Sequence, residues 1–296
     1  MLDQELRKKG IGGSEVAAIL GLDDFSSPYK VWLAKTGREI LSSNNKYTEA
    51  GLILESAVAE YFEQRTTYRI IKSSAKSKTF THPQYEFAIG TPDRQYMIPK
   101  VVGRGILECK TTQYAYDDIP EKWFIQLQWY LGVMGSAFGS VAWLEHGLDF
   151  KYREYTYDRE FFDYLMNAVA TFWNDHVVKD VPPEPINVDD VNRIYTRHAE
   201  GKRLEATIEM IGVHSELLSV REAIAELQAK EKAMVDSVKM VMLDAEIVAT
   251  GIQPLFTWKT AKDSMRFDED KFKEDNPELW EKYRWSVSGS RRFLIK

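Results

Sequence analysis

The segment that decides the fold is Gly90–Lys110, with the sequence GTPDRQYMIPKVVGRGILECK. It contains two short runs rich in β-branched and aromatic residues and bounded by Gly and Pro, which is typical of strands in a small sheet. Side chains alternate between the two faces of a strand, so Glu108 and Lys110 lie on one face and Cys109 on the other. The tight connection between the two runs can place Asp93 beside them.

Two carboxylates and a lysine in one place suit the hydrolysis of a phosphodiester. That reaction needs a divalent cation to neutralise the phosphate and activate water, and a positive group to position the water. A Glu-x-Lys pair alone is weak evidence, because most such pairs lie on solvated strand faces. Here the pair lies between the apolar residues 105–107 and Thr111-Thr112, near a core edge where unpaired charge is costly. We therefore interpret Asp93, Glu108 and Lys110 as a catalytic group.

The flanking helices offer further polar side chains. Residues 48–65 have the periodicity of a helix, and Glu55 lies close to its apolar stripe. A lone glutamate there is more often a surface residue paired with lysine, but its place beside the stripe favours a metal ligand. Residues 120–135 predict another helix. Gln126 and Gln128 are two residues apart on it, so their side chains point to different faces. We expect only one glutamine to reach the site.

The pattern around these motifs predicts a mixed α/β domain. Short runs typical of strands fill residues 68–111, and a strand pair follows the helix at 120–135. A helix at 158–177 closes the domain. The segment VPPEPINVDD, residues 181–190, contains three prolines and indicates a linker.

We therefore expect one domain at 1–182 and an extension at 183–296. Residues 198–246 form a long helical region rich in charge, either one helix or a hairpin of two. The end of the chain predicts two strands flanking a helix, with Arg291-Arg292-Phe293 in the second strand. The pattern assigns no role to the extension.

Composition narrows the class of protein. The chain has 296 residues, a net charge of -6 and an isoelectric point near 5.6, which argues weakly against a general nucleic-acid coat protein but not against a nuclease with a local basic groove. Cys109 is the only cysteine and the five histidines are scattered, so a metal would be bound mainly by oxygen. The absence of a long apolar run or a signal peptide predicts a soluble, cytoplasmic protein without a membrane partner.

Near the N-terminus, Gly12-Gly13-Ser14 precedes a short apolar run. We expect a helix at 14–20, with Ser14 as its N-cap and Gly21 at its end. Free backbone amides and a hydroxyl at a helix start can bind an anion, and Arg7 could supply a bidentate partner. From these residues alone, an ordinary N-cap with a surface arginine is the better interpretation.

Four segments together resemble the YqaJ-type viral recombinases, which belong with the lambda-type exonucleases of the PD-(D/E)xK superfamily. They are Arg7–Ile19 (RKKGIGGSEVAAI), Gly51–Glu55 (GLILE), Gly90–Lys110 (GTPDR and LECK) and Gln126–Tyr130 (QLQWY). Their order and spacing match the family over residues 5–175. The implied fold is an α/β restriction-endonuclease-like core with a central mixed sheet flanked by helices, followed here by a C-terminal helical and α+β extension.

The resemblance implies metal ligands in this sequence. Asp93, Glu108 and the backbone carbonyl of Cys109 would bind one magnesium ion. Glu55, together with Asp93, would help to hold a second, and manganese could substitute for magnesium.

The resemblance also implies groups that act on water and on the DNA end. Lys110 would orient and polarise the attacking water, and Gln126 would contact the lysine or that water. Arg7 and Ser14 would hold the 5′-terminal phosphate of DNA. Thr91 would do the same, although the resemblance leads us to expect a serine there.

The implied function is a magnesium-dependent 5′-to-3′ exonuclease of double-stranded DNA that releases 5′-mononucleotides. It would leave 3′ single-strand overhangs for phage-type homologous recombination by single-strand annealing. The implied partners are double-stranded DNA ends, a RecT-like annealing protein and further copies of the chain in a ring, with a trimer favoured and a tetramer possible. The setting would be the cytoplasm of a bacterial host that carries a phage or prophage.

Two other classes of function stay open. An endonuclease or a single-strand nuclease could use the same site, although one cysteine excludes a four-cysteine iron–sulfur cluster. A noncatalytic module could bind DNA ends or the annealing protein with the same fold. The presence of Asp93, Glu108 and Lys110 together argues against the module.

Overall fold

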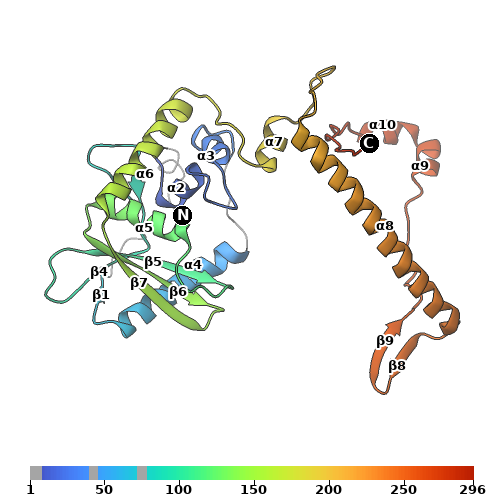
Figure 1. The fold of residues 1–296 in the computed structure, drawn as a ribbon, viewed down its shortest axis with the longest axis horizontal. Helices are drawn as coiled ribbons and strands as arrows, with labels where there is room; N and C mark the ends of the chain where they lie inside the picture. Colours follow the sequence, from blue (N-terminus) through green and yellow to red (C-terminus); the bar gives the residue numbers. More distant parts are fainter. Residues whose placement is uncertain (1–8, 40–45, 72–78) are drawn as a thin grey trace. The chain divides into compact units, whose positions relative to one another are not determined.

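The computed structural model describes residues 9–39, 46–71 and 79–296. The chain divides into two compact units, Met1–Tyr195 and Thr196–Lys296 (Figure 1). No helix within the described ranges is long and apolar enough to cross a bilayer.

A five-stranded mixed sheet forms the centre of the first unit (Figure 1). Its strands, in spatial order, are β1 (Arg69–Ile70), β4 (Arg94–Met97), β5 (Gly105–Thr112), β6 (Phe138–Glu145) and β7 (Asp149–Thr156). β5 and β6 are parallel, whereas the other neighbours are antiparallel. A parallel pair needs a crossover, and α5 (Glu121–Met134) supplies it. A separate small sheet pairs β2 (Phe80–Thr81) with β3 (Ile89–Gly90).

Helices cover both faces of the central sheet, which confirms the predicted fold class. One face is covered by α2 (Gly13–Ile19), α3 (Pro28–Lys35), α5 and α6 (Arg159–Phe172), the last continuing as a π-helix, Trp173–Val178. These helices share a hydrophobic cluster with Ile106 of β5. The other face is covered by α4 (Lys46–Arg65), whose Val58 and Phe62 belong to a cluster with Leu107. Because adjacent residues of β5 enter opposite clusters, the strand is buried on both faces.

The first helix begins earlier than the sequence pattern predicts. Its N-cap is Gly12, and the predicted N-cap, Ser14, lies inside the helix and is exposed. The Gly12 N–H donates to Glu15 Oε2 at 2.9 Å, so a glutamate side chain satisfies the free amide in place of a serine hydroxyl. The predicted end is close, because α2 stops before Gly21, which has a positive φ of 73°.

The proline-rich segment leads into a helix that packs on the first unit. This helix, α7 (Val188–Ile194), carries Asp190, which is fully buried and accepts a 2.6 Å hydrogen bond from Ser27 Oγ. Arg193 Nη1 pairs with Glu39 Oε2 at 2.6 Å. The compact unit therefore continues to Tyr195, past the expected boundary after residue 182.

The second unit is built on one long helix, α8 (Ile208–Met242), which has 35 residues. A single helix is one of the two alternatives open for residues 198–246. The hairpin of β8 (Ile247–Thr250) and β9 (Gln253–Thr257) follows, and then α9 (Glu269–Asp275) and α10 (Pro277–Tyr283). The predicted strand at Arg291-Arg292-Phe293 is wrong: β8 and β9 pair with each other, and residues 284–296 form neither helix nor strand.

Candidate active site

Glu108 and Lys110 project from the same face of β5, as the alternation of a strand predicts. Lys110 Nζ donates to Glu108 Oε2 at 3.1 Å. The side chain of Glu108 is 1% exposed and that of Lys110 is 21% exposed. The pair therefore connects the core of the sheet with solvent.

Gln126 of α5 joins this pair through both ends of its amide. Its Oε1 accepts from Lys110 Nζ at 2.9 Å, and its Nε2 donates to Glu108 Oε2 at 2.9 Å. Tyr130, one helical turn later, accepts a further hydrogen bond from Gln126 Nε2 at 3.2 Å. Gln128 instead bonds to backbone groups just before α6. Only one glutamine reaches the site, in agreement with their spacing.

Asp93 lies at the end of the β4–β5 pairing. Its Oδ2 accepts from the Cys109 N–H at 2.7 Å, and its own N–H donates to Glu108 Oε1 at 3.4 Å. The paired register of β4 and β5 ends at Arg94 and Leu107. The N–H and C=O of one strand residue point to the same edge, so the Cys109 carbonyl also points toward the space beyond β4.

Glu55 reaches the same group of residues from α4. Arg94 Nη1 donates to Glu55 Oε1 and to the Asp93 carbonyl oxygen, the latter at 2.6 Å. Arg94 Nη2 also donates to Ser56 Oγ at 3.3 Å. Sequence reasoning missed Arg94 and Tyr130. The available signals were that Arg94 directly follows Asp93 and that Tyr130 is one helical turn after Gln126.

Burial raises the pKa of all three carboxyls, and the charge of Asp93 raises the pKa of Glu108 and Glu55 further. Burial, and then the charge of Asp93, raises the pKa of Glu108 to about 8. Burial is also the main cause of the raised pKa of Asp93. The pKa of Glu55 is raised by burial and then by Asp93, against the lowering effect of Arg94.

The pKa of Lys110 moves in the opposite sense to that of an isolated buried lysine. Burial alone would lower it, but the charges of Glu108 and Asp93 together outweigh burial and leave the pKa raised. The ammonium group is therefore charged at neutral pH. It faces the carboxylates as a fixed positive charge.

The oxygens of this group fit a divalent cation of the magnesium class. Such cations prefer carboxylate and carbonyl oxygens, and a positive charge among repelling carboxylates would lower their raised pKa values. Arg94 and Lys110 occupy oxygens of Glu55 and Glu108 here. Across residues 9–39, 46–71 and 79–296, no three His, Cys, Asp or Glu side chains are spaced as metal ligands. In this structure the side chains of Arg94 and Lys110 bind the carboxylates of Glu55 and Glu108.

The glycine-rich segment at α2 lies against the same site. A Cβ added to Gly13 would lie 2.6 Å from Tyr130 Cε1 and 3.1 Å from Gln126 Cγ. A Cβ added to Gly90 would lie 3.0 Å from Tyr130 Cδ1. Glycine thus lets two segments, far apart in sequence, meet on the Tyr130 ring.

Two of the three predicted phosphate-binding residues, Ser14 and Thr91, directly follow these two glycines. Ser14 is exposed, one residue after Gly13. Thr91, one residue after Gly90, shares a hydrogen bond between hydroxyls with Thr79 at 3.0 Å. Arg7 lies outside the described residues.

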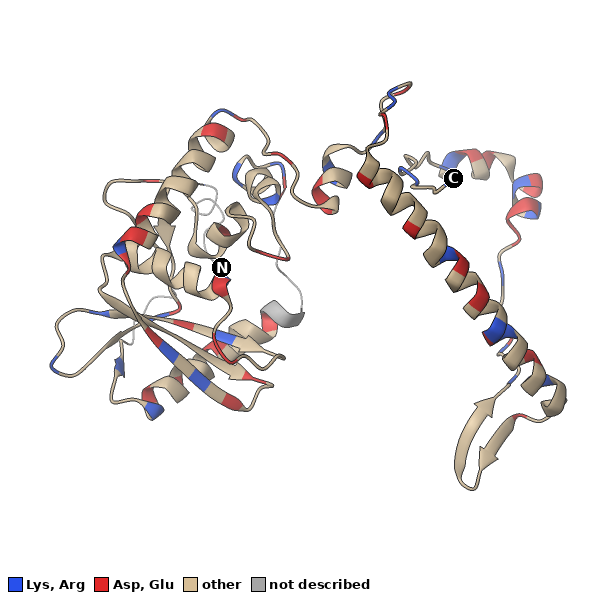
Figure 2. Ribbon diagram, viewed as in Figure 1, with Lys and Arg blue, Asp and Glu red and all other residues tan. Residues whose placement is uncertain are grey.

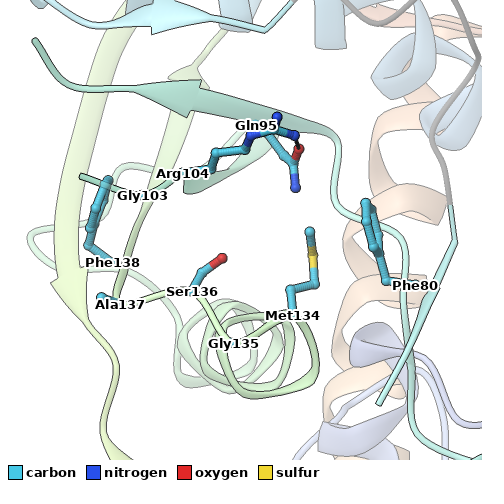
Figure 3. Close-up of a pocket in the computed structure, with 9 residues that line it drawn as sticks. All are labelled: Phe80, Gln95, Gly103, Arg104, Met134, Gly135, Ser136, Ala137 and Phe138. Atoms are coloured by element: carbon cyan, nitrogen blue, oxygen red, sulfur yellow. Dashed lines mark hydrogen bonds between the residues drawn. The ribbon is translucent and has the colours of Figure 1, made fainter. Parts of the chain in front are cut away.

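The cavity at the other end of α5 does not contain this group. It has a volume of about 320 Å³ and is lined by Phe80, Gln95, Gly103, Arg104 and residues 134–138 (Figure 3). Figure 3 shows Arg104 reaching toward Gln95 across one wall, with Met134 opposite. Glu55, Asp93, Glu108, Lys110 and Gln126 are not among its lining residues. The site's polar group therefore lies away from this cavity.

Comparison with known proteins identifies a matching protein family and a relative with similar sequence. Residues 4–137 match the model of the YqaJ-like viral recombinase domain. The YqaJ protein of Bacillus subtilis strain 168 is 33% identical over a 304-residue alignment, which covers 98% of this chain and 92% of the relative. The similarity thus includes the second unit as well as the first.

Solved structures give a weaker likeness. The alkaline exonuclease of Laribacter hongkongensis has a TM-score of 0.47 and 11% identity, covering 65% of this chain and 97% of its own. A phage-related exonuclease of Haemophilus somnus 129PT has a TM-score of 0.41 and 15% identity, covering 60% of this chain and 98% of its own. The family assignment rests on the sequence relative.

Proposed function

The chain belongs to the YqaJ-like viral recombinase family, and we propose that it is a metal-dependent deoxyribonuclease that digests double-stranded DNA from a 5′ end. The observation that carries this proposal is the meeting of the buried Glu108, the partly buried Asp93 and Glu55, a charged lysine and a glutamine, which come from α4, β5, α5 and the loop before β4. Burying mutually repelling carboxylates opposes folding unless a cation or hydrogen bonds compensate, so a functional reason for the group is favoured.

The carboxylates would hold the metal. Asp93, Glu108 and the Cys109 carbonyl would bind one magnesium ion, and Glu55 with Asp93 would hold a second, with manganese able to substitute. When bound, these ions supply charge neutralisation at the phosphate and a water molecule of lowered pKa. The direction of the Cys109 carbonyl supports its part in this set.

Lys110 would position the attacking water. Its ammonium group carries three donors, of which one is directed to Glu108 and one to Gln126. A third donor can be offered to water. Gln126 holds the ammonium group through its Oε1, so it orients the lysine and does not itself transfer a proton.

Ser14, Thr91 and Arg7 would hold the 5′-terminal phosphate. The packing of Gly13 and Gly90 on one tyrosine ring supports this role for the residue that follows each glycine. Holding the terminal phosphate fixes the polarity of digestion, so the products would be 5′-mononucleotides and a 3′ single-strand overhang. The overhang would pass to a RecT-like annealing protein for recombination, in the cytoplasm of a bacterial host, with copies of the chain forming a ring of three or four.

A comparison of DNA substrates tests the polarity of digestion and distinguishes the exonuclease from the other functions considered. The purified protein is incubated, with magnesium or with chelator, with linear duplex DNA labelled at either end, with a closed circular duplex and with single-stranded DNA. We expect magnesium-dependent release of the 5′ label as mononucleotide from the linear duplex, with the circle intact.

Other results would assign another function. Cleavage of the circle identifies an endonuclease, and preferential loss of single-stranded DNA identifies a single-strand nuclease. Binding of DNA ends with no product in magnesium or manganese identifies a noncatalytic module. Each of these outcomes overturns the proposed exonuclease.

A further inference from the structure

The long helix of the second unit carries a seven-residue apolar repeat. Its first set of positions, called a, is Met210, Leu217, Ile224, Glu231 and Val238. Its second set, called d, is Val213, Val220, Leu227, Met234 and Val241. Steps of three and four residues alternate without a break, which keeps both sets on one side of the helix, here called the heptad stripe.

Within the described residues of the second unit, most of the heptad stripe is exposed, and Leu217 and Val238 are half-buried. Ile224 is 48% exposed, Leu227 66% and Val241 82%. The helix is roughly 50 Å long at 1.5 Å per residue. A helix of this kind gains most of its stability from packing an apolar face, and a long exposed apolar stripe indicates an interface.

We propose that α8 forms a parallel coiled coil with the α8 helices of further copies of this chain. Charge complementarity favours a second copy as the occupant. In a parallel pair, the residue before an a position faces the residue five places later on the partner helix. Glu216 would therefore face Arg221 of the partner subunit, with opposite charge.

The polar member of the stripe fits the same arrangement. Glu231 occupies an a position, where two like charges would repel each other across the interface. Lys230 directly precedes it, and in a parallel pair this lysine flanks the partner's glutamate. Figure 2 shows basic and acidic residues interspersed along the helix, so neither sign dominates its surface.

The apolar residues do not select one number of strands. Leu217 at a with Val213 and Val220 at d is typical of three or four strands, whereas Ile224 at a with Leu227 at d is typical of two. The proposal therefore names further copies of this chain and not their number, and it rests on α8 alone and not on nuclease activity.

Sedimentation of the full-length protein tests the proposal. The stripe variant is Ile224→Glu with Leu227→Glu, and the matched control is Leu218→Glu with Met240→Glu, which lie on the same helix outside the stripe. Circular dichroism and thermal unfolding check that each variant is folded. We expect wild type and control to sediment as multiples of the 34.2 kDa chain. The dissociation constant of the assembly should be roughly tenfold higher or more for the stripe variant, because its glutamates place charge in the interface.

Charge exchange and cross-linking test the parallel register. Arg221→Glu should weaken assembly, and adding Glu216→Arg should restore it. In a Cys109→Ser background, Leu227→Cys should form a disulfide between subunits on oxidation, whereas Leu218→Cys should not. A monomeric wild type, or an unchanged mass in the stripe variant, would overturn the proposal. The second result would assign assembly to another surface and leave the stripe for a different protein.

Discussion

At the scale of the single residue, Glu108 links the chemistry of the site to the stability of the fold. Its pKa is raised to about 8 by burial and by Asp93, from an ordinary value of 4.5. Between these two pH values the unfolded chain has lost a proton that the folded chain retains. The free energy of unfolding of the metal-free protein should therefore fall as pH rises from about 4.5 to about 8.

Replacing Glu108 by glutamine should reduce this pH dependence to the part that Asp93 and Glu55 contribute. In chelator at pH 8, Glu108→Gln should be more stable than wild type, and near pH 4 the two should be similar. Denaturant unfolding across this pH range measures the difference. Magnesium or manganese should then raise the melting temperature of wild type but not of the variant. A variant less stable than wild type at pH 8 would show that the buried carboxylate does not oppose folding.

The contacts of Glu108 and Lys110 could be predicted because they follow from one strand's alternation. The same is true of Gln126 and Gln128, which one helix separates by its own geometry. The contact between Arg94 and Glu55 joins β4 to α4 across residues distant in sequence. The spacing of residues in the sequence does not indicate which other element a long side chain contacts, so this pair could not be predicted.

At the scale of elements, the meeting of α2 and α5 depends on a missing side chain. Gly13→Ala would place a methyl group 2.6 Å from Tyr130 and should force the two helices apart. We expect a loss of about 1–3 kcal/mol in stability, from overpacking, together with reduced cleavage because Gln126 moves. Thermal unfolding and DNA digestion measure the two effects.

The neighbouring glycine supplies the control. A Cβ on Gly12 meets nothing closer than Glu15 Oε2 at 3.8 Å, and its φ of −89° is open to other residues. Gly12→Ala should therefore cost less stability and leave cleavage near the wild-type rate. Equal effects of the two substitutions would mean that contact with Tyr130 does not set the position of α2.

The start of α2 also shows why the exact boundary of a helix could not be predicted from the sequence. Serine is a favoured N-cap, so Ser14 is the natural choice from the pattern. In the structure, Glu15 bonds both to the Gly12 N–H and to Lys35 Nζ, the latter at 2.7 Å. The glutamate's partner on α3 is a tertiary contact, and tertiary contacts decide between near-equal helix starts.

At the scale of the whole molecule, α7 decides where the first unit can be cut. A chain ending at Tyr195 keeps the buried bond between Ser27 and Asp190, whereas a chain ending at residue 182 loses it. A hydrogen bond to a charged group such as this carboxylate contributes about 1.5–3 kcal/mol. We expect the shorter chain to melt several degrees lower, as measured by calorimetry. Equal melting temperatures would place the boundary at residue 182.

The order of sheet and helices in the first unit could be predicted because strand and helix periods differ clearly there. The role of the proline-rich segment could not, since prolines that end one helix look the same before a linker and before a packed helix. In the second unit, the seven-residue repeat is present in the sequence. Only the structure shows that this repeat lies on one continuous helix and that most of its residues are exposed within the second unit.

Two lysine variants test whether this group of residues hydrolyses DNA. Lys110→Ala removes the lysine that bonds to buried Glu108, and Lys151→Ala removes one that bonds in the same way to buried Glu145. The second pair lies in the same sheet but outside the site. Release of mononucleotides from linear duplex DNA in magnesium is measured for both, with folding checked by circular dichroism.

We expect the rate to fall roughly 10²- to 10⁴-fold for Lys110→Ala, as for the loss of a group that acts on the reacting water. Lys151→Ala should digest DNA at nearly the wild-type rate. If Lys110→Ala retains wild-type activity, or if both variants lose activity equally, the lysine on β5 is structural and the hydrolytic site lies elsewhere.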